Sequence, residues 1–356
     1  MGALSLPAES FAGADLADSR GLEDAAAFVV DLLERPAGDI RVAEGQLDLA
    51  DDLVVEGHPD RFDLTPLSPA DPGTAWAIDG GSCMLADGRS FHVAAYRAAR
   101  VRFRAGVTDV IESPPLQVRA LSRDEMRRLY RERLDEMGSE VPERIPDIPR
   151  PVDFFRECAE WQRVRETVRE ASPGDLVLVD GSLHGGPWVA ASFVRHTHAE
   201  AVERDVSLAS VVKASTLFWG RNAPLVGLLK RRGDRELGAA RWCVRISNAP
   251  QFERLYVGDI FVAHLAPTAP HAFRVDVARG PRPAEEVLAR LAGLSEDSAF
   301  VGYPYPLARA HQSARVSGYA VADLRLAFRA ALSGRGMSED DIETLFQDFH
   351  EVLNRS

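Results

Sequence analysis

Two apolar stretches of the chain end in the same way, Trp76-Ala77-Ile78-Asp79-Gly80-Gly81-Ser82 and Leu176-Val177-Leu178-Val179-Asp180-Gly181-Ser182-Leu183. Each has the length and branched apolar residues of a short buried strand, followed by an aspartate and a glycine. Because glycine lets the backbone turn sharply, we expect each aspartate to lie at the carboxyl end of its strand. Two carboxylates on adjacent strands repel one another unless a cation lies between them. The stretches therefore predict a divalent-metal site at Asp79 and Asp180.

The order of elements around these stretches indicates an α/β fold. Residues 90–99 and 100–107 have strand character and are expected to form an antiparallel meander with the first stretch, or together one long bent strand. Apolar periodicity over Pro151–Glu170 predicts a helix that leads into the second stretch. This order matches ribonuclease H-like folds, a mixed sheet flanked by helices in which the first and fourth strands are neighbours. The analogy concerns the fold and does not by itself establish a function.

Extensions are expected on both sides of this core. Residues 1–74 should form a helical and irregular N-terminal extension, with a helix over residues 21–35. The core is expected to span residues 75–320, with a helical insertion at about 113–150. Residues 321–356 are expected to form extra C-terminal helices.

The composition is that of an ordinary globular protein, with 356 residues of which 46% are hydrophobic and 27% charged. No apolar run approaches the roughly 18 residues that cross a bilayer, and the first residues lack the pattern of a secretory signal. We therefore expect a cytoplasmic protein without membrane contact. Cys83, Cys158 and Cys243 are far apart and odd in number, which supports neither a disulfide framework nor a zinc knuckle.

Four landmarks between about residue 75 and residue 320 resemble those of the NurA family of DNA-end-processing nucleases. They are IDGGS at 78–82, a glutamate-bearing helix before the second strand, LVLVDGSL at 176–183 and GYPYPLARAH at 302–311. A supporting landmark, SVVKAS at 210–215, is similar to the family's lysine-containing segment after the second aspartate. A single DGS is a weak signal, whereas landmarks in this order, with Tyr303 eight residues before His311, are fairly specific.

The resemblance implies roles for particular residues. The two metal-binding aspartates of the family correspond to Asp79 and Asp180, and its tyrosine and histidine near the C-terminus correspond to Tyr303 and His311. His311 is then a metal ligand, a general base or a phosphate contact. Tyr303 is expected to orient a phosphate or to stack on a base.

The intervening glutamate of the family corresponds to one of three residues on the predicted helix, Glu157, Glu160 or Glu166. We prefer Glu160 as the metal ligand, because the stretch Glu160-Trp161-Gln162 most resembles the family helix. The chain departs from the family pattern in having Gly80-Gly81 where a simple DGS has one glycine, which leaves the role of Ser82 open.

The implied activity is metal-dependent hydrolysis of DNA. The resemblance implies a 5′-to-3′ exonuclease, often with single-strand endonuclease action, that resects DNA ends in double-strand break repair with a HerA-type hexameric ATPase. Cleavage of a phosphodiester needs in-line attack by water and stabilisation of the leaving oxygen, and two divalent ions about 4 Å apart can supply both. Ligands such as aspartate and glutamate suit Mn²⁺ or Mg²⁺.

The net charge of −12, from 42 basic and 54 acidic residues, is unusual for a protein that must hold DNA. Arginines are concentrated, however, in residues 97–104 and 221–245. We expect a two-fold homodimer whose channel is lined by these segments. The helix over residues 21–35 and the C-terminal helices should supply dimer or docking contacts.

Two other functions stay open from the sequence. A catalytically inactive NurA-like binding subunit of a HerA complex would be favoured if Glu160 pointed away from Asp79 and Asp180. An actin-like-fold ATPase would also place aspartate-glycine turns at its site, but its C-terminal glycine pair has no convincing counterpart here. Elsewhere, His196-Thr197-His198 has the spacing of a metal pair on a strand, without a completing ligand. Asp276 is expected to face solvent or to pair with an arginine.

Overall fold

The structure, a computed structural model, describes residues 53–55, 60, 62–87, 91–136, 151–184, 189, 191–215, 217–219, 223–246, 256–334 and 336–346. The helix expected over residues 21–35 lies outside these ranges. Among the helices that are described, none combines the length and the apolar character needed to span a membrane.

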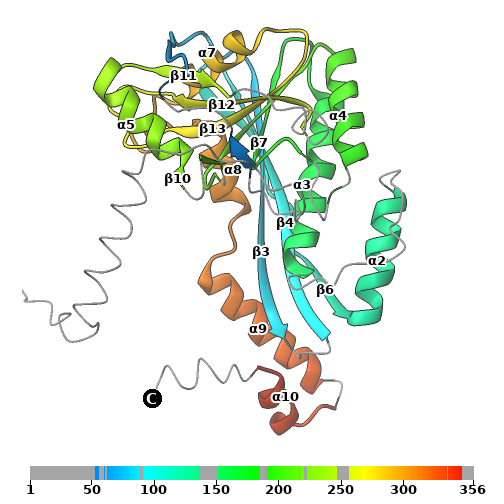
Figure 1. Cartoon of the computed structure of the whole chain (residues 1–356). Coiled ribbons are helices and arrows are strands. Elements are labelled where there is room, and N and C mark those ends of the chain that lie inside the picture. Colours follow the sequence, from blue (N-terminus) through cyan, green and yellow to red (C-terminus); the bar gives the residue numbers. More distant parts are fainter. Residues whose placement is uncertain are drawn as a thin grey trace, which may run out of the picture.

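A ten-stranded mixed sheet runs through the centre of the molecule (Figure 1). Its strands are β2 (Thr65–Pro66), β3 (Ala75–Asp87), β4 (Phe91–Arg104), β5 (Val107–Glu112), β6 (Gln117–Ser122), β7 (Leu176–Asp180), β8 (Ser207–Val212), β11 (Trp242–Arg245), β12 (Gly258–His264) and β13 (Phe273–Ala278). In space they follow the order β2-β11-β12-β13-β8-β7-β3-β4-β5, and β6 also pairs with β4. A separate small sheet contains β1 (Leu53–Val55), β9 (Leu217–Trp219) and β10 (Ala223–Pro224).

The middle of the large sheet has the ribonuclease H-like arrangement, which confirms the predicted fold class. β4 runs antiparallel to β3 and β5, whereas β3, β7 and β8 run parallel to one another. β4 is one continuous strand of 14 residues that covers most of both strands expected between residues 90 and 107. β13, β12 and β11 then extend the sheet beyond β8 with antiparallel pairing.

The described helices are α2 (Arg123–Glu136), α3 (Pro151–Glu170), α4 (Ala191–Glu203), α5 (Leu225–Leu237), α7 (Ala284–Leu294), α8 (Tyr305–Ala314), α9 (Gly318–Ser333) and α10 (Glu339–Phe346). Of these, α3 has the bounds that its periodicity predicts. The region expected as a helical insertion contains the strand β6 before α2, and its residues 137–150 lie outside the described ranges.

Different helices cover the two faces of the sheet because successive strand residues point to opposite faces. The face that packs against α3 and α4 includes Trp76, Ile78, Val177 and Val179. The other face, with Ala75, Ala77, Leu176 and Leu178, packs against α7 and α8. The same alternation places Asp79 and Asp180 on the α8 face.

β3 does not end at Asp79, so the expected strand end is wrong there. The strand continues to Asp87 in a long hairpin with β4, while its parallel pairing with β7 ends at Ile78 and Val179. Gly80 and Gly81 make room for neighbours: a Cβ on Gly80 would lie 2.1 Å from Oε1 of Glu160, and one on Gly81 would lie 1.9 Å from the carbonyl oxygen of Ala314.

Gly181 behaves as the sequence predicts. Its φ of 122° is a conformation that residues with a side chain rarely adopt, and β7 ends immediately before it at Asp180. The two aspartate-glycine motifs therefore use glycine for different purposes, close approach in β3 and a turn after β7.

The outer end of the β3–β4 hairpin carries the C-terminal helices. Its buried residues form a small core that packs against α9, composed of Leu85, Ala86, Val93 and Ala95 with Leu324 and Phe328. Figure 1 shows α9 and α10 at this end of the molecule, away from α4, α5 and α7.

Candidate metal centre

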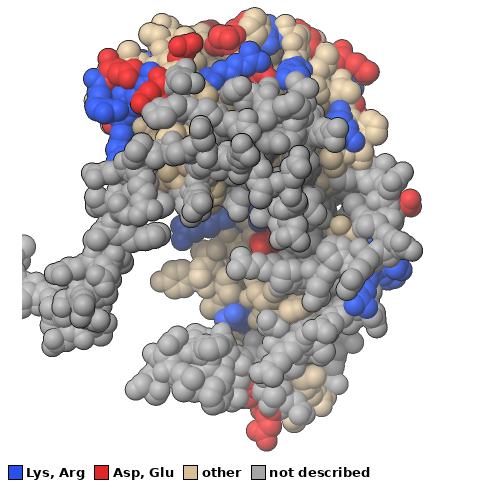
Figure 2. Space-filling view, in the orientation of Figure 1, with Lys and Arg blue, Asp and Glu red and all other residues tan. Residues whose placement is uncertain are grey.

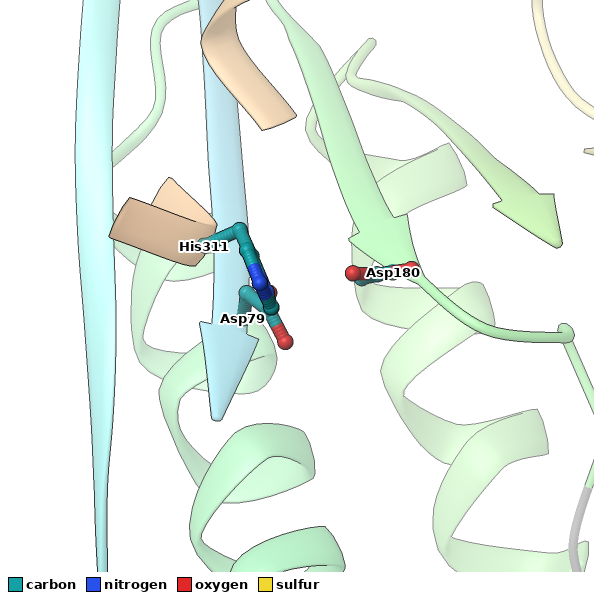
Figure 3. A group of neighbouring side chains, drawn as sticks. All are labelled: Asp79, Asp180 and His311. Atoms are coloured by element: carbon teal, nitrogen blue, oxygen red, sulfur yellow. The ribbon is translucent and has the colours of Figure 1, made fainter. Parts of the chain in front are cut away.

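Asp79 and Asp180 lie side by side at the place where β7 ends and β3 continues (Figure 3). Asp79 is 5% exposed and the side chain of Asp180 is 11% exposed. With His311 of α8 they form a group in which one ligand atom from each residue lies within 4.8 Å of the others. The group offers two carboxylate oxygens and an imidazole nitrogen, a set that suits a divalent cation such as Mn²⁺.

His311 reaches the aspartates because α8 is held firmly at its C-terminal end. Nε of Arg97 on β4 donates to the carbonyl oxygen of Ala314 at 3.0 Å, and Oγ of Ser113 donates to the carbonyl oxygen of Ser313 at 2.7 Å. The missing side chain of Gly81 lets this end of the helix pack directly on β3. Nδ1 of His311 then lies 2.7 Å from Oδ2 of Asp79.

Lys213 is a residue of this site to which the sequence assigned no role. Its Nζ forms an ion pair with Asp180, lies 3.7 Å from Oδ2 of Asp79 and lies 3.3 Å from Nδ1 of His311. Lys213 directly follows β8, the parallel neighbour of β7, so the sheet topology brings it to Asp180. The lysine in the SVVKAS landmark was the available signal, but only the pairing of β7 with β8 reveals its contacts.

The position of Lys213 indicates that a metal ion would fit among Asp79, Asp180 and His311. A positively charged group already sits among both carboxylates and the imidazole, as a close cluster of acidic groups requires. The side chain of Lys213 is 40% exposed, so its long stem can withdraw toward solvent. The donor set and this stand-in ammonium both fit a divalent ion.

Glu160 approaches the site from the opposite face of the sheet, on α3. It is 5% exposed, and its Oε1 accepts a hydrogen bond from Nη1 of Arg156 at 2.6 Å while passing over Gly80. The side chains of Glu157 and Glu166 are 32% and 55% exposed and contact Arg156 and Arg163.

Of the three candidate glutamates, Glu160 is the buried one, and it packs on Gly80 next to Asp79. It is not a member of the group of Asp79, Asp180 and His311, and its role as a ligand stays a prediction.

Two carboxyl groups, those of Glu160 and Asp180, hold their protons more tightly than usual. Burial raises the pKa of Glu160 to about 8, the charges of Asp79 and Glu157 add to this rise, and Arg156 opposes it. Burial also raises the pKa of Asp180 to about 7, with a further contribution from Asp79 and opposition from Lys213. Because a metal ion binds the ionised carboxylates, its binding at neutral pH must release protons.

Tyr303 lies in the loop before α8, and its ring packs edge-on against Phe273 with the ring centres 5.4 Å apart. Nζ of Lys213 lies 5.6 Å from the centre of the Tyr303 ring. Burial raises the pKa of Tyr303 well above its usual value, helped by the charges of Asp180 and Asp79. Its buried hydroxyl has no hydrogen-bond partner among the described residues, so Tyr303 is a neutral group close to Asp180 and Lys213.

Residues 73–316 match the family model of the NurA domain. The chain belongs to the NurA family. The NurA nuclease from Sulfolobus solfataricus is 16% identical and gives a TM-score of 0.53, with 89% of this chain and 96% of that chain covered. A NurA structure bound to dAMP and manganese is 9% identical with a TM-score of 0.52, covering 92% and 99% of the two chains.

A further NurA structure is also 9% identical, with a TM-score of 0.51 and coverage of 93% of this chain and 100% of that chain. At these identities the likeness to NurA structures shows the fold. No curated protein matched this NurA chain in sequence.

Other sequence signals in this NurA chain have structural explanations. His196 and His198 are on the helix α4, not on a strand, and residues two apart on a helix do not face one another. Asp276 pairs with Arg274, as one of the two alternatives predicted, and both side chains are 1% exposed.

The arginines of residues 97–104, expected to line a channel of a homodimer, make contacts within the chain, and the channel itself stays a prediction. Arg97 holds the end of α8, Arg100 is 6% exposed and pairs with Glu112 and Glu170, and Arg102 pairs with Asp109. Around α5 and α7, the coloured part of Figure 2 shows basic and acidic side chains interspersed. Arg97, Arg100 and Arg102 therefore stabilise the fold of the NurA domain.

Proposed function

We propose that this NurA-family chain is a divalent-metal-dependent DNA nuclease that uses Mn²⁺ or Mg²⁺. The observation that carries the proposal is the meeting of Asp79, Asp180 and His311 within 4.8 Å, with the ammonium of Lys213 among them. One similar protein is described as a NurA nuclease and another as NurA bound to dAMP and manganese. Both descriptions support assigning phosphodiester hydrolysis to this site.

Asp79, Asp180 and His311 would hold the metal, with Glu160 as a further ligand from α3. A bound divalent ion supplies an activated water and neutralises charge on the phosphate and the leaving oxygen. Asp180 and Glu160 would have to lose their protons to hold the ion, because both have raised pKa values. Asp79 fixes the imidazole through Nδ1, which leaves Nε2 of His311 to take part in proton transfer or ligation.

Lys213 and Tyr303 are proposed to help bind the DNA substrate. With a metal ion held by the carboxylates, the ammonium of Lys213 would be available to contact a DNA phosphate. The ring of Tyr303, whose centre lies 5.6 Å from Nζ of Lys213, attracts this cation. This pair holds the phosphate close to the carboxylates, which is the main requirement of an in-line displacement.

Several finer features rest on the resemblance of the motifs to the family. They are 5′-to-3′ exonuclease polarity, single-strand endonuclease action, end resection in double-strand break repair with a HerA-type hexameric ATPase, a homodimer and a cytoplasmic location. The approach of Glu160 to Asp79 supports an active nuclease over the inactive binding subunit, which would not need this carboxylate over Gly80.

The test is a cleavage assay on single- and double-stranded DNA labelled at the 5′ or the 3′ end, with Mn²⁺, Mg²⁺ or chelator. The wild-type chain should cleave only with metal, Asp180→Ala should be inactive, and His196→Ala on the exposed side of α4 should match wild type. Cleavage by Asp180→Ala, or by wild type in chelator, would place the activity elsewhere. Light scattering at micromolar concentration tests the dimer, and a monomer would contradict it.

A further inference from the structure

The turn that follows Asp180 is fastened from a distance by a buried ion pair. Arg274 and Asp276 both lie on β13, two strands away from β7, and each side chain is 1% exposed. Nε of Arg274 donates to Oδ1 of Asp276 at 2.8 Å, and its Nη2 donates to Oδ2 at 2.9 Å. Burying two charges is so unfavourable that a matched apolar pair often serves stability equally well, so stability alone does not account for this pair.

The pair has a contact that an apolar replacement could not make. Oδ2 of Asp276 also accepts a hydrogen bond at 3.1 Å from the backbone N–H of Leu183, three residues after Asp180. Leu183 is fully buried, so its N–H has no access to water. A carboxylate is a strong acceptor for such a donor, because hydrogen bonds to ionised groups are shorter and stronger than neutral ones.

The other bonds of this turn show what the contact controls. After Asp180 the chain bends at Gly181, whose N–H donates to the carbonyl oxygen of Val211 at 3.2 Å. Leu183 then enters the core on the α3 face, while Asp180 lies on the α8 face. The hydrogen bond from Leu183 to Asp276 therefore fixes the far end of the turn that carries Asp180.

Arg274 offsets the energetic cost of burying the charge of Asp276. Its guanidinium neutralises the carboxylate and lies 5.0 Å from the centre of the Tyr256 ring, which is itself buried. An unpaired negative charge here would add to the repulsion between Asp79 and Asp180. Paired with Arg274, Asp276 supplies a strong acceptor without that penalty.

We propose that Asp276, neutralised by Arg274, is a positioning residue that holds Asp180 at the correct place for metal binding through the backbone of Leu183. This inference rests on the proposed function, since it concerns the same metal site. Within the described part of the chain, Asp276 bonds to Leu183 and Arg274 and to none of the proposed metal ligands. Groups that hydrogen-bond a metal ligand directly change metal affinity by about 10–100-fold when they are removed, and we expect an effect within this range for Asp276, which acts through the backbone.

Two double variants that differ only in the acceptor test the proposal. Arg274→Met with Asp276→Asn removes both charges but keeps a side-chain oxygen for Leu183, whereas Arg274→Met with Asp276→Leu removes the oxygen too. Mn²⁺ affinity is measured by titration calorimetry, and thermal unfolding confirms that each variant folds. The first should bind Mn²⁺ close to wild type, and the second should bind about 10–100-fold more weakly. Equal affinities in the two variants would overturn the proposal.

Hydrogen exchange provides a readout that does not depend on metal. The amide of Leu183 in the wild-type chain should exchange slowly, and rapid exchange would overturn the proposal. If the wild-type chain binds no Mn²⁺, the proposed function fails on its own. The positioning role of Asp276 is then tested by hydrogen exchange over residues 176–183. Faster exchange in the leucine variant than in the asparagine variant supports this role, and equal exchange refutes it.

Discussion

Gly80→Ala should damage the site while leaving most of the fold intact. The new Cβ would lie 2.1 Å from Oε1 of Glu160 and 2.7 Å from Cγ of Arg156. Unstrained contact begins at 3.4 Å, so the carboxylate oxygen must move by about 1.3 Å. The displaced atoms belong to side chains, and overpacking of this kind costs roughly 1–3 kcal/mol of unfolding free energy.

The effect of Gly80→Ala on catalysis should be larger than its effect on stability suggests. Misplacing a group of an active site by 1 Å can reduce the rate about 100-fold. That factor corresponds to about 2.7 kcal/mol of transition-state stabilisation. We therefore expect kcat/KM for labelled DNA to fall by about two orders of magnitude, while chemical denaturation still shows one cooperative transition.

Two other glycine substitutions serve as controls for this experiment. Gly227→Ala in α5 meets nothing within 4 Å and should leave activity unchanged and stability equal or slightly higher, because alanine favours a helix. Gly81→Ala meets the backbone carbonyl of Ala314 at 1.9 Å, which cannot rotate away, and should cost more stability than Gly80→Ala. Wild-type activity in Gly80→Ala would refute the reasoning, because Glu160 would then not be needed where the structure places it.

Asp180→Asn should abolish Mn²⁺ binding in calorimetry and cleavage in the gel assay without unfolding the chain, because an amide is a weak ligand for a hard cation; retained cleavage would exclude Asp180 as a ligand. Lys213→Met should lower the melting temperature of the metal-free chain by leaving Asp79 and Asp180 without their cation, and Mn²⁺ should restore it; an unchanged melting temperature would contradict this. The pKa values of Glu160 and Asp180, about 8 and about 7, lie above their unfolded values near 4. Their contribution to stability is therefore present below about pH 4 and lost as pH rises toward 8. The metal-free chain should thus melt at a lower temperature at about pH 8 than at about pH 5. Glu160→Gln should reduce that difference in melting temperature.

Local sequence patterns predicted the elements whose own residues determine them. The apolar period of α3 and the run Leu176–Asp180 ending in an aspartate with a following glycine gave both elements and their order. Asp79 was placed beside Asp180 by the ribonuclease H-like analogy. Periodicity does not specify which strands pair, so this placement could not come from the residues alone.

The misplaced features depend on partners that are distant in sequence. Gly80 and Gly81 read as a turn because glycine permits one, yet the long ladder with β4 keeps β3 extended, and the glycines accommodate Glu160 and Ala314 instead. The contacts of Lys213 require β7 and β8 to be neighbours. The histidines at 196 and 198 suggested a strand from spacing alone, whereas the surrounding apolar residues pack as the helix α4.

The position of His311 along the chain sets when the site can exist during protein synthesis. Asp79 and Asp180 are made early, but α8, which brings His311 to them, is translated only after residue 304. Domains fold as they emerge from the ribosome at roughly 5–20 residues per second, so a nascent chain spends many seconds with its two aspartates and no histidine. A chain interrupted before α8 would likewise lack His311, and the capacity to cut DNA therefore arises only as the last elements of the core are completed.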